Sequence, residues 1–279
     1  MPNIKNIIFI IAFSLLIHPA HGQKDIDSLK NIIGQQRNDS SEVKALLNLS
    51  SILSDQNLID SSTVLIQKAL LLSSKIGYQK GEAEALLQLG RILSYLGSYS
   101  QSISFLFKAL HVYEQMKDQD GITAAQMVLQ GTYREAGDYK NSLAHAFQAK
   151  QRVDKNDSKA NIIRKGMPML PFIFGEIGET YQYMNELDSA EFYAQKAIDQ
   201  HLLFNGATWN FPFYLLGKIQ LKQGRYNEAL QSFRIAVLLA IKNGVLKDTL
   251  DIYNSITELY RETGNSDSAI YYGKKITDK

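Results

Sequence analysis

The sequence predicts an all-α solenoid of about six helix-turn-helix repeats. Three observations carry this prediction: an apolar motif recurs six times in one register, a Gly or Asn recurs at the turn after it, and a small residue recurs in the helix beyond that turn. Such a long repeat indicates stacked helix pairs, because one pair cannot bury its own apolar face and is stabilised by its neighbours.

The motif of the first helix has two large apolar residues three apart, then a small or polar residue, and usually an aromatic residue or Leu three further on. Leu86-x-x-Leu89-Gly90-x-x-Leu93 is the clearest copy. This is the spacing of one helical face. The small or polar positions of the six copies are Ser50, Gly90, Gln130, Gly178, Gly217 and Thr257, so the successive intervals are 40, 40, 48, 39 and 40 residues.

The predicted turn inside each pair is equally regular. Its positions are Asn57, Gly97, Gly137, Asn185, Gly224 and Gly264. Gly and Asn tolerate the left-handed conformation that ends a helix. Two residues later an apolar anchor follows in five copies, at Ile59, Tyr99, Tyr139, Leu187 and Tyr226, whereas the sixth has Ser266.

Small residues predict close contact between the two helices of a pair. They lie in both helices, at Gly90, Gly178 and Gly217 in the first and at Ala190, Ala229 and Ala269 in the second.

The predicted organisation has three parts. Residues 1–22 form a signal peptide, and residues 23–40 form a capping helix and loop, with Ser40 or Ser41 as the next N-cap. The array of repeats then fills 41–279, as 41–80, 81–120, 121–160, 168–206, 207–246 and 247–279.

The 48-residue interval holds a polar loop over 154–158, followed by Gly166, Pro168 and Pro171. Because Pro is poorly tolerated inside a helix, one of these prolines should start or kink a helix. The extra residues are either a tolerated loop insertion or a segment that gates or extends a binding face.

The N-terminus has the secretory pattern. A positive region with Lys5 precedes an apolar run from Ile7 to Ile17, and Ala20 and Gly22 stand where a signal peptidase needs small residues. The sequence therefore predicts a chain that starts at Gln23 and is periplasmic or secreted. An uncleaved N-terminal anchor helix is the alternative.

Charge and motifs narrow the function classes. The 30 Lys and Arg nearly balance the 28 Asp and Glu, and no block of like charge indicates nucleic acid or a membrane surface as a partner. The absence of Cys excludes disulfides and thiolate metal sites. No catalytic motif is recognised, and His111, His145 and His201 lack ligand spacing, so we expect no enzyme activity, no cofactor and no metal site.

The repeated motif resembles the tetratricopeptide repeat family over about residues 41–277. The intervals are longer than the family's usual length of about 34 residues. HEAT repeats have such lengths but lack this pairing of Leu-Gly-x-x-Tyr with Gly-x-Tyr. The resemblance is to a long, exported type found in the ectodomains of sensor proteins of Bacteroidetes-like bacteria.

The resemblance implies a right-handed α-α superhelix whose first helices line a concave groove for a protein or peptide partner. The candidate groove residues lie beside the first-helix motif; they are Leu87, Arg91, Tyr95, Met127, Arg134, Glu179, Tyr183, Tyr214 and Lys218. They are either a binding face of mixed aromatic and charged side chains or an ordinary solvated surface. The arrangement that clamps a peptide's C-terminal carboxylate in chaperone-binding relatives is not recognised here.

The predicted function is therefore that of an exported, non-catalytic scaffold that binds a protein or peptide. The alternative is the ligand-sensing ectodomain, truncated or complete, of a two-component histidine kinase or a transcriptional regulator. We also expect Ile270, Tyr271 and Ile276 of the last repeat to lack a covering helix, which would favour self-association.

Overall fold

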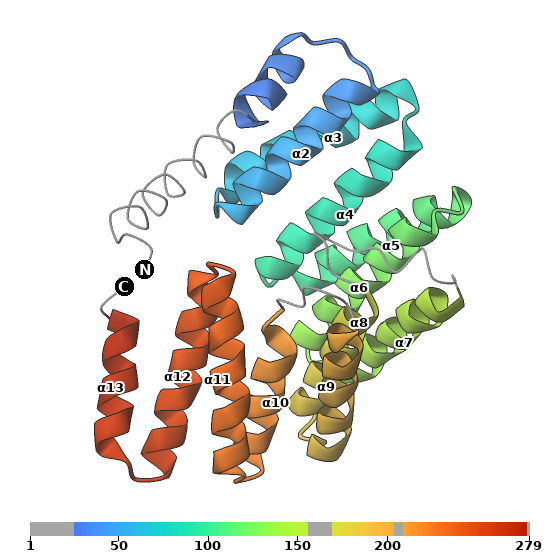
Figure 1. Ribbon diagram of the computed structural model, residues 1–279. Coiled ribbons are helices and arrows are strands. Elements are labelled where there is room, and N and C mark those ends of the chain that lie inside the picture. The colour runs from blue at the N-terminus through green and yellow to red at the C-terminus, as the bar shows by residue number, and fades with distance from the viewer. Residues whose placement is uncertain (1–24, 156–168, 204–208, 278–279) are drawn as a thin grey trace. The chain divides into compact units, whose positions relative to one another are not determined.

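The computed structural model describes residues 25–155, 169–203 and 209–277. Each regular element in these ranges is a helix (Figure 1). Residues 25–34 form a helix, and twelve more follow: α2 (Ser40–Asp55), α3 (Ile59–Ile76), α4 (Gln79–Tyr95), α5 (Tyr99–Gln115), α6 (Gln119–Glu135), α7 (Tyr139–Lys155), α8 (Met169–Tyr183), α9 (Leu187–Leu202), α10 (Phe211–Lys222), α11 (Tyr226–Lys242), α12 (Leu246–Glu262) and α13 (Ser266–Thr277). The predicted signal peptide and most of the predicted insertion, including Gly166 and Pro168, lie outside the described residues.

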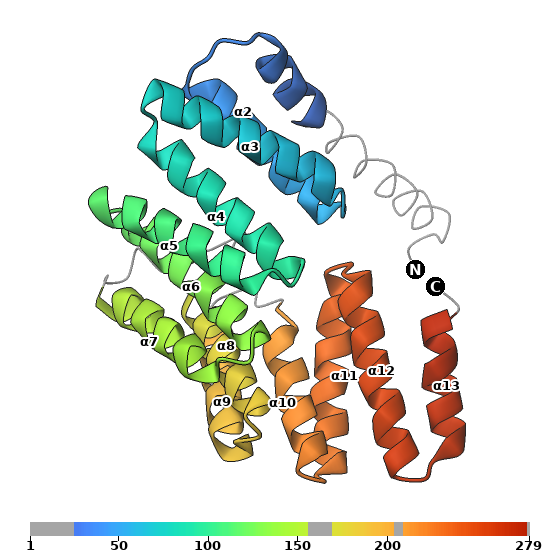
Figure 2. The same ribbon diagram turned by 180° about the vertical axis from the view of Figure 1, so that it is seen from behind.

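The helices pack in consecutive pairs. α2 packs on α3, α4 on α5, α8 on α9, α10 on α11, and α12 on α13, each pair joined by a short turn that both views show (Figures 1 and 2). α6 and α7 also meet, because the side-chain amide of Gln130 donates to Ser142 Oγ at 3.3 Å. The fold class and the prediction of about six helix-turn-helix repeats are confirmed.

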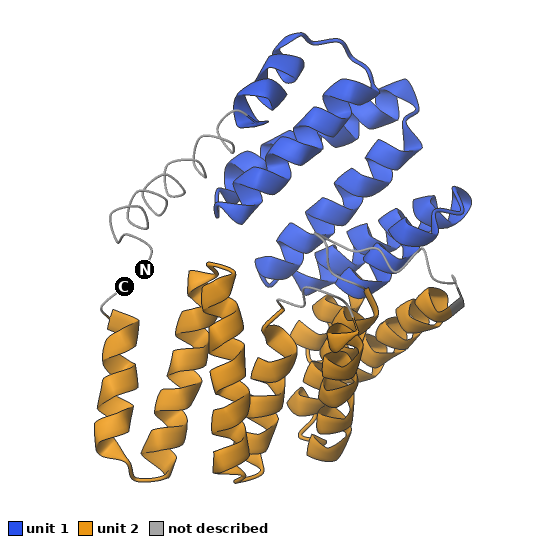
Figure 3. Cartoon of the chain, viewed as in Figure 1, with its two compact units in different colours: residues 1–128 blue, residues 129–279 orange. Residues whose placement is uncertain are grey.

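The chain divides into two compact units, residues 1–128 and 129–279, with the division inside α6 (Figure 3). Within the first unit α4 contacts both α2 and α3. Within the second, α8 contacts α7 and α10, α10 contacts α9 and α12, and α11 contacts α12. Within each unit, helix pairs therefore pack on their sequence neighbours, as expected for a repeat array.

The turns inside the pairs follow the sequence prediction. Their backbone φ angles are all positive: 62° at Asn57, 75° at Gly97, 80° at Gly137, 60° at Asn185, 74° at Gly224 and 72° at Gly264. The predicted anchors two residues later are the first residues of α3, α5, α7, α9 and α11. Asn and Gly thus end each first helix, and an apolar residue begins the second helix in five of the six pairs.

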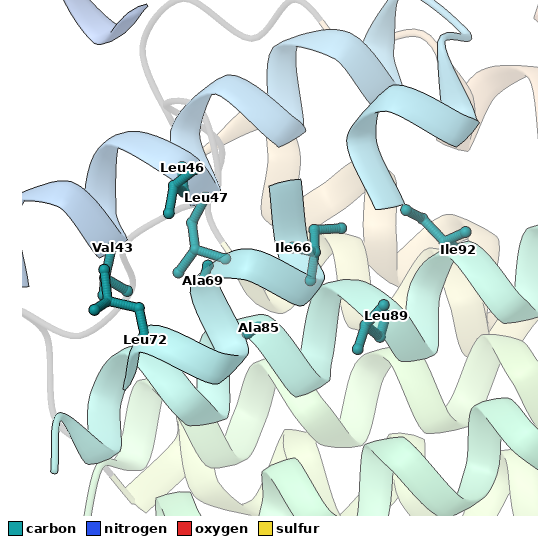
Figure 4. Packing of buried hydrophobic residues seen from close by; sticks show 9 residues of the cluster. All are labelled: Val43, Leu46, Leu47, Ile66, Ala69, Leu72, Ala85, Leu89 and Ile92. Carbon is teal, nitrogen blue, oxygen red and sulfur yellow. The ribbon is translucent and has the colours of Figure 1, made fainter. Parts of the chain in front are cut away.

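The core lies between the helices of a pair and the next pair along the chain. In the first unit it joins α2, α3 and α4 through Leu46, Ile66 and Leu89 (Figure 4). The predicted close approach of helices is confirmed at Gly178, where an added Cβ would lie 3.1 Å from the Ala190 carbonyl oxygen and 3.2 Å from the Ala194 nitrogen. Small residues therefore set the distance between α8 and α9.

The predicted N-cap of α2 is wrong by one or two residues, whereas the predicted proline near a helix start is found in α8. The N-cap of α2 is Asp39, not Ser40 or Ser41, because Asp39 Oδ1 accepts from the backbone N–H groups of Ser41 at 2.9 Å and Glu42 at 3.1 Å. Pro171 lies in the first turn of α8, where its missing N–H costs no helical hydrogen bond. A proline near a helix start is thus confirmed.

None of the helices within the described ranges combines the length and the apolar character needed to cross a bilayer.

Candidate functional site

A row of charged and aromatic side chains, with one serine, runs along the first helices of the second unit. Helical spacing places its members on common faces, since Glu176, Glu179 and Tyr183 follow one another at intervals of three and four residues on α8. We call this surface the first-helix row. It consists of Arg134 on α6, Glu176, Glu179 and Tyr183 on α8, Tyr214 and Lys218 on α10, and Ser255 on α12.

Arg134 is the centre of the row's ion pairs. Its Nη1 lies 2.7 Å from Glu176 Oε2 and 2.8 Å from Glu179 Oε2, and its Nε lies 3.5 Å from Glu135 Oε1. The side chains of Arg134, Glu176 and Glu179 are only 12%, 14% and 16% exposed. One guanidinium therefore links α6 to α8 and is shared among three carboxylates.

Burial and neighbouring charges shift the pKa values of both Arg134 and Glu179. Burial disfavours the cation of Arg134, but the charges of Glu176 and Glu179 outweigh it and raise the arginine pKa. Burial also raises the pKa of Glu179, although Arg134 and Lys218 oppose that shift. The surroundings of Glu179 therefore disfavour its charged form, even with Arg134 beside it.

The aromatic members are fixed by contacts on several sides. The Arg134 guanidinium lies 5.8 Å from the centre of the Tyr183 ring, and the Tyr139 ring lies 6.2 Å from it. Tyr183 nevertheless remains 50% exposed. On α10 the ammonium of Lys218 lies 5.4 Å from the Tyr214 ring, and Tyr214 Oη lies 3.3 Å from Ser255 Oγ.

The candidate residues of the sequence analysis divide into two groups. Arg134, Glu179, Tyr183, Tyr214 and Lys218 all belong to the first-helix row. The other four lie in the first unit, where Arg91 is half-buried, Tyr95 is 69% exposed, and Leu87 and Met127 are buried at 8% exposure each.

Glu135, Glu176 and Ser255 were not predicted from the sequence. Glu176 could have been found, because it stands three residues before Glu179 and so shares its helical face. Glu135 and Ser255 give no such signal in the sequence, since their roles depend on which neighbouring helix packs beside them.

The three histidines lie in different surroundings. His111 is exposed and pairs with Gln115 at 2.9 Å. His145 stacks on Tyr133 with ring centres 5.5 Å apart, and buried His201 lies edge-on to Trp209 at 6.3 Å. Burial lowers the pKa of both His145 and His201, so neither is suited to carry charge near neutral pH.

Comparison with protein families finds one match, over most of α10 and α11. Residues 212–240 match the model of the tetratricopeptide repeat. No curated protein matches the chain.

Several solved structures have a similar fold. BtubC (BKLC) from P. vanneervenii has 12% identity and a TM-score of 0.61, over 81% of this chain and 91% of that one. PilF from Pseudomonas aeruginosa has 14% identity and a TM-score of 0.58, over 85% and 90%. A Rap protein complexed with Competence and Sporulation Factor has 13% identity and a TM-score of 0.65, over 90% and 78%. At such low identity these similarities establish the fold alone.

Proposed function

We propose that this chain of tetratricopeptide-like helical repeats is an exported, non-catalytic scaffold that binds a protein or an extended peptide through the first-helix row. Repeat domains of this type typically serve as protein-binding scaffolds. The observation that favours the row is Tyr183, which stays half exposed although Arg134 and Tyr139 fix its ring.

A fixed, exposed aromatic ring is suited to binding. Tyr and Arg are enriched at the energetic centres of protein interfaces, where their large planar groups fill pockets of a partner. A side chain that is already held in place loses little conformational freedom on binding. Arg134, ordered by Glu176 and Glu179, and Tyr183 beside it both meet this condition.

The proposed contact set is narrower than the set of sequence candidates. It keeps Arg134, Glu179, Tyr183, Tyr214 and Lys218, which belong to the row. Leu87 and Met127 leave it, because a partner could reach little of their buried side chains. Arg91 and Tyr95 stay as candidates for a separate contact on the first unit.

Binding in similar folds supports the proposal. The Rap protein of similar fold was solved in complex with Competence and Sporulation Factor. Export is proposed from the charged, apolar and small-residue pattern of residues 1–22. Determining the N-terminal residue of the protein from an envelope fraction tests export, with Gln23 expected and Met1 contradicting cleavage.

The binding proposal is tested by a pull-down from envelope extract with the purified chain and two variants. We expect Tyr183→Ala to lose a specific partner, because it removes the exposed ring of the row. Phe192→Ala is the matched control, since Phe192 is similarly exposed, at 55%, but lies on α9, the second helix of its pair. Equal capture by the wild type and Tyr183→Ala, with both folded, would contradict the proposed site.

A further inference from the structure

The first-helix row has more negative than positive charge around Arg134. Glu135, Glu176 and Glu179 all lie within ion-pair distance of this one guanidinium. Lys218 acts on Glu179 from α10, but its ammonium lies over the Tyr214 ring. The row is therefore locally acidic, although the whole chain has a net charge of +2.

Arg134 cannot fully neutralise Glu179. Its Nη1 lies 2.7 Å from Glu176 and 2.8 Å from Glu179 and can donate one of its two N–H groups to each, but the single positive charge of the guanidinium is then shared by both carboxylates. Both are held close to it while only 14% and 16% exposed, and poor hydration strengthens their mutual repulsion. A second cation beside Glu179 would relieve this repulsion.

Solvent reaches this part of the row at Tyr183, which is half exposed. The ring of Tyr183, four residues after Glu179 on α8, offers a half-exposed π surface. An aromatic face beside a carboxylate is a favourable environment for a lysine or arginine side chain.

We propose that the partner presents a Lys or Arg side chain to the first-helix row, between Glu179 and the Tyr183 ring. The inference rests on the proposed function and specifies the chemistry of its partner. Charge complementarity favours a basic segment, and an acidic segment or a terminal carboxylate would meet the excess of negative charge.

The first experiment selects random peptides, displayed with blocked termini, on the purified chain. We expect Lys or Arg to be enriched at one position of the selected peptides. A synthetic peptide is then compared with its copy in which citrulline, a neutral analogue of the same shape, replaces the selected Arg. The dissociation constant should rise about tenfold or more, because a hydrogen-bonded charge pair is lost, and added salt should weaken binding of the Arg peptide only.

Two variants locate the cation. Glu179→Gln should also weaken the Arg peptide about tenfold, and it should bind the Arg and citrulline peptides equally well. Glu262→Gln is the matched control, because Glu262 is an exposed carboxylate on α12 outside the row. The comparison of the two peptides on the unmodified chain remains decisive if Glu179→Gln fails to fold.

Other outcomes separate this inference from the proposed function. Selected peptides without a basic residue, or with an acidic one, overturn the inference; if Tyr183→Ala still abolishes their binding, the row remains the binding site. Peptides that bind Tyr183→Ala and the wild type equally well overturn both. A failure to select any peptide contradicts the inference as well.

Discussion

At the scale of single residues, the space around a glycine decides the effect of adding a methyl group. Gly131→Ala should raise the free energy of unfolding by about 0.5–1 kcal/mol, because Ala restricts the unfolded chain and its Cβ meets open space. Gly178→Ala should lower it by about 1–3 kcal/mol, because its Cβ would press on the backbone of α9 at 3.1 Å.

Urea denaturation of the two variants, followed by circular dichroism, measures both changes. Opposite signs are expected, and a loss of stability in both variants would contradict the open space at Gly131.

The charge of Glu179 should also appear in the pH dependence of stability. Its pKa is raised in the folded chain by burial and by Glu176 and Glu135, against the opposing charges of Arg134 and Lys218. The stability gained by protonating Glu179 is therefore fully present below the unfolded pKa and is lost as pH rises through the folded pKa. Relative to the wild type, Glu179→Gln should gain stability across this window.

Urea denaturation at a series of pH values from acidic to neutral checks this trend. A difference in unfolding free energy between Glu179→Gln and the wild type that stays constant with pH would contradict it.

Single residues also show the limit of the sequence analysis. The position of Gly178 in the motif predicted that α8 and α9 pack closely there, because a small residue at this position lets the two helices of a pair approach each other. Leu87 and Met127 were predicted beside a groove yet are buried. A residue next to a motif residue points about a third of a turn away from it around the helix. Whether its side chain is exposed then depends on how the neighbouring helices pack.

At the scale of elements, the turns were the most predictable feature. Asn57 and Asn185 have positive φ, as do the four glycines at the same position, because the left-handed turn selects these two residue types. The turns between repeats were not predicted. Gly77 and Gly244 adopt positive φ there, but Lys117 does so at the equivalent turn, where its sequence gives no signal.

Lys117 suggests a stabilising substitution. Its φ of 55° costs a residue with a Cβ about 1 kcal/mol or more of folded-state strain. Gly removes this strain, but it also increases the conformational entropy of the unfolded chain, which cancels part of the gain. Lys117→Gly should therefore raise the free energy of unfolding by about 0.5 kcal/mol. Gly77→Ala, at the equivalent turn with φ of 68°, should lower it, and thermal unfolding of the two variants measures both. A destabilised Lys117→Gly would indicate that the lysine side chain makes a stabilising contact.

At the scale of the whole molecule, stability should be local. Within each unit, helix pairs pack on their sequence neighbours, and in the second unit α12 contacts α10, α11 and α13. Such arrays behave as a line of coupled repeats, so damage in one repeat spreads mainly to the adjacent ones.

Ile252→Ala tests this property. Ile252 is fully buried in a cluster with Phe233 and Ala236 of α11, so the variant should lose about 2–5 kcal/mol of local stability. Hydrogen exchange followed by mass spectrometry should show faster exchange in α11, α12 and α13, while α7, which α8, α9, α10 and α11 separate from α12 along the chain, keeps the wild-type rate. Equal acceleration in α7 would instead mean that the second unit unfolds as one cooperative block.

In a molecule with local stability, a partner that joins α6, α8 and α10 along the first-helix row would slow exchange in these helices first, so the same measurement with a bound basic peptide would map the site.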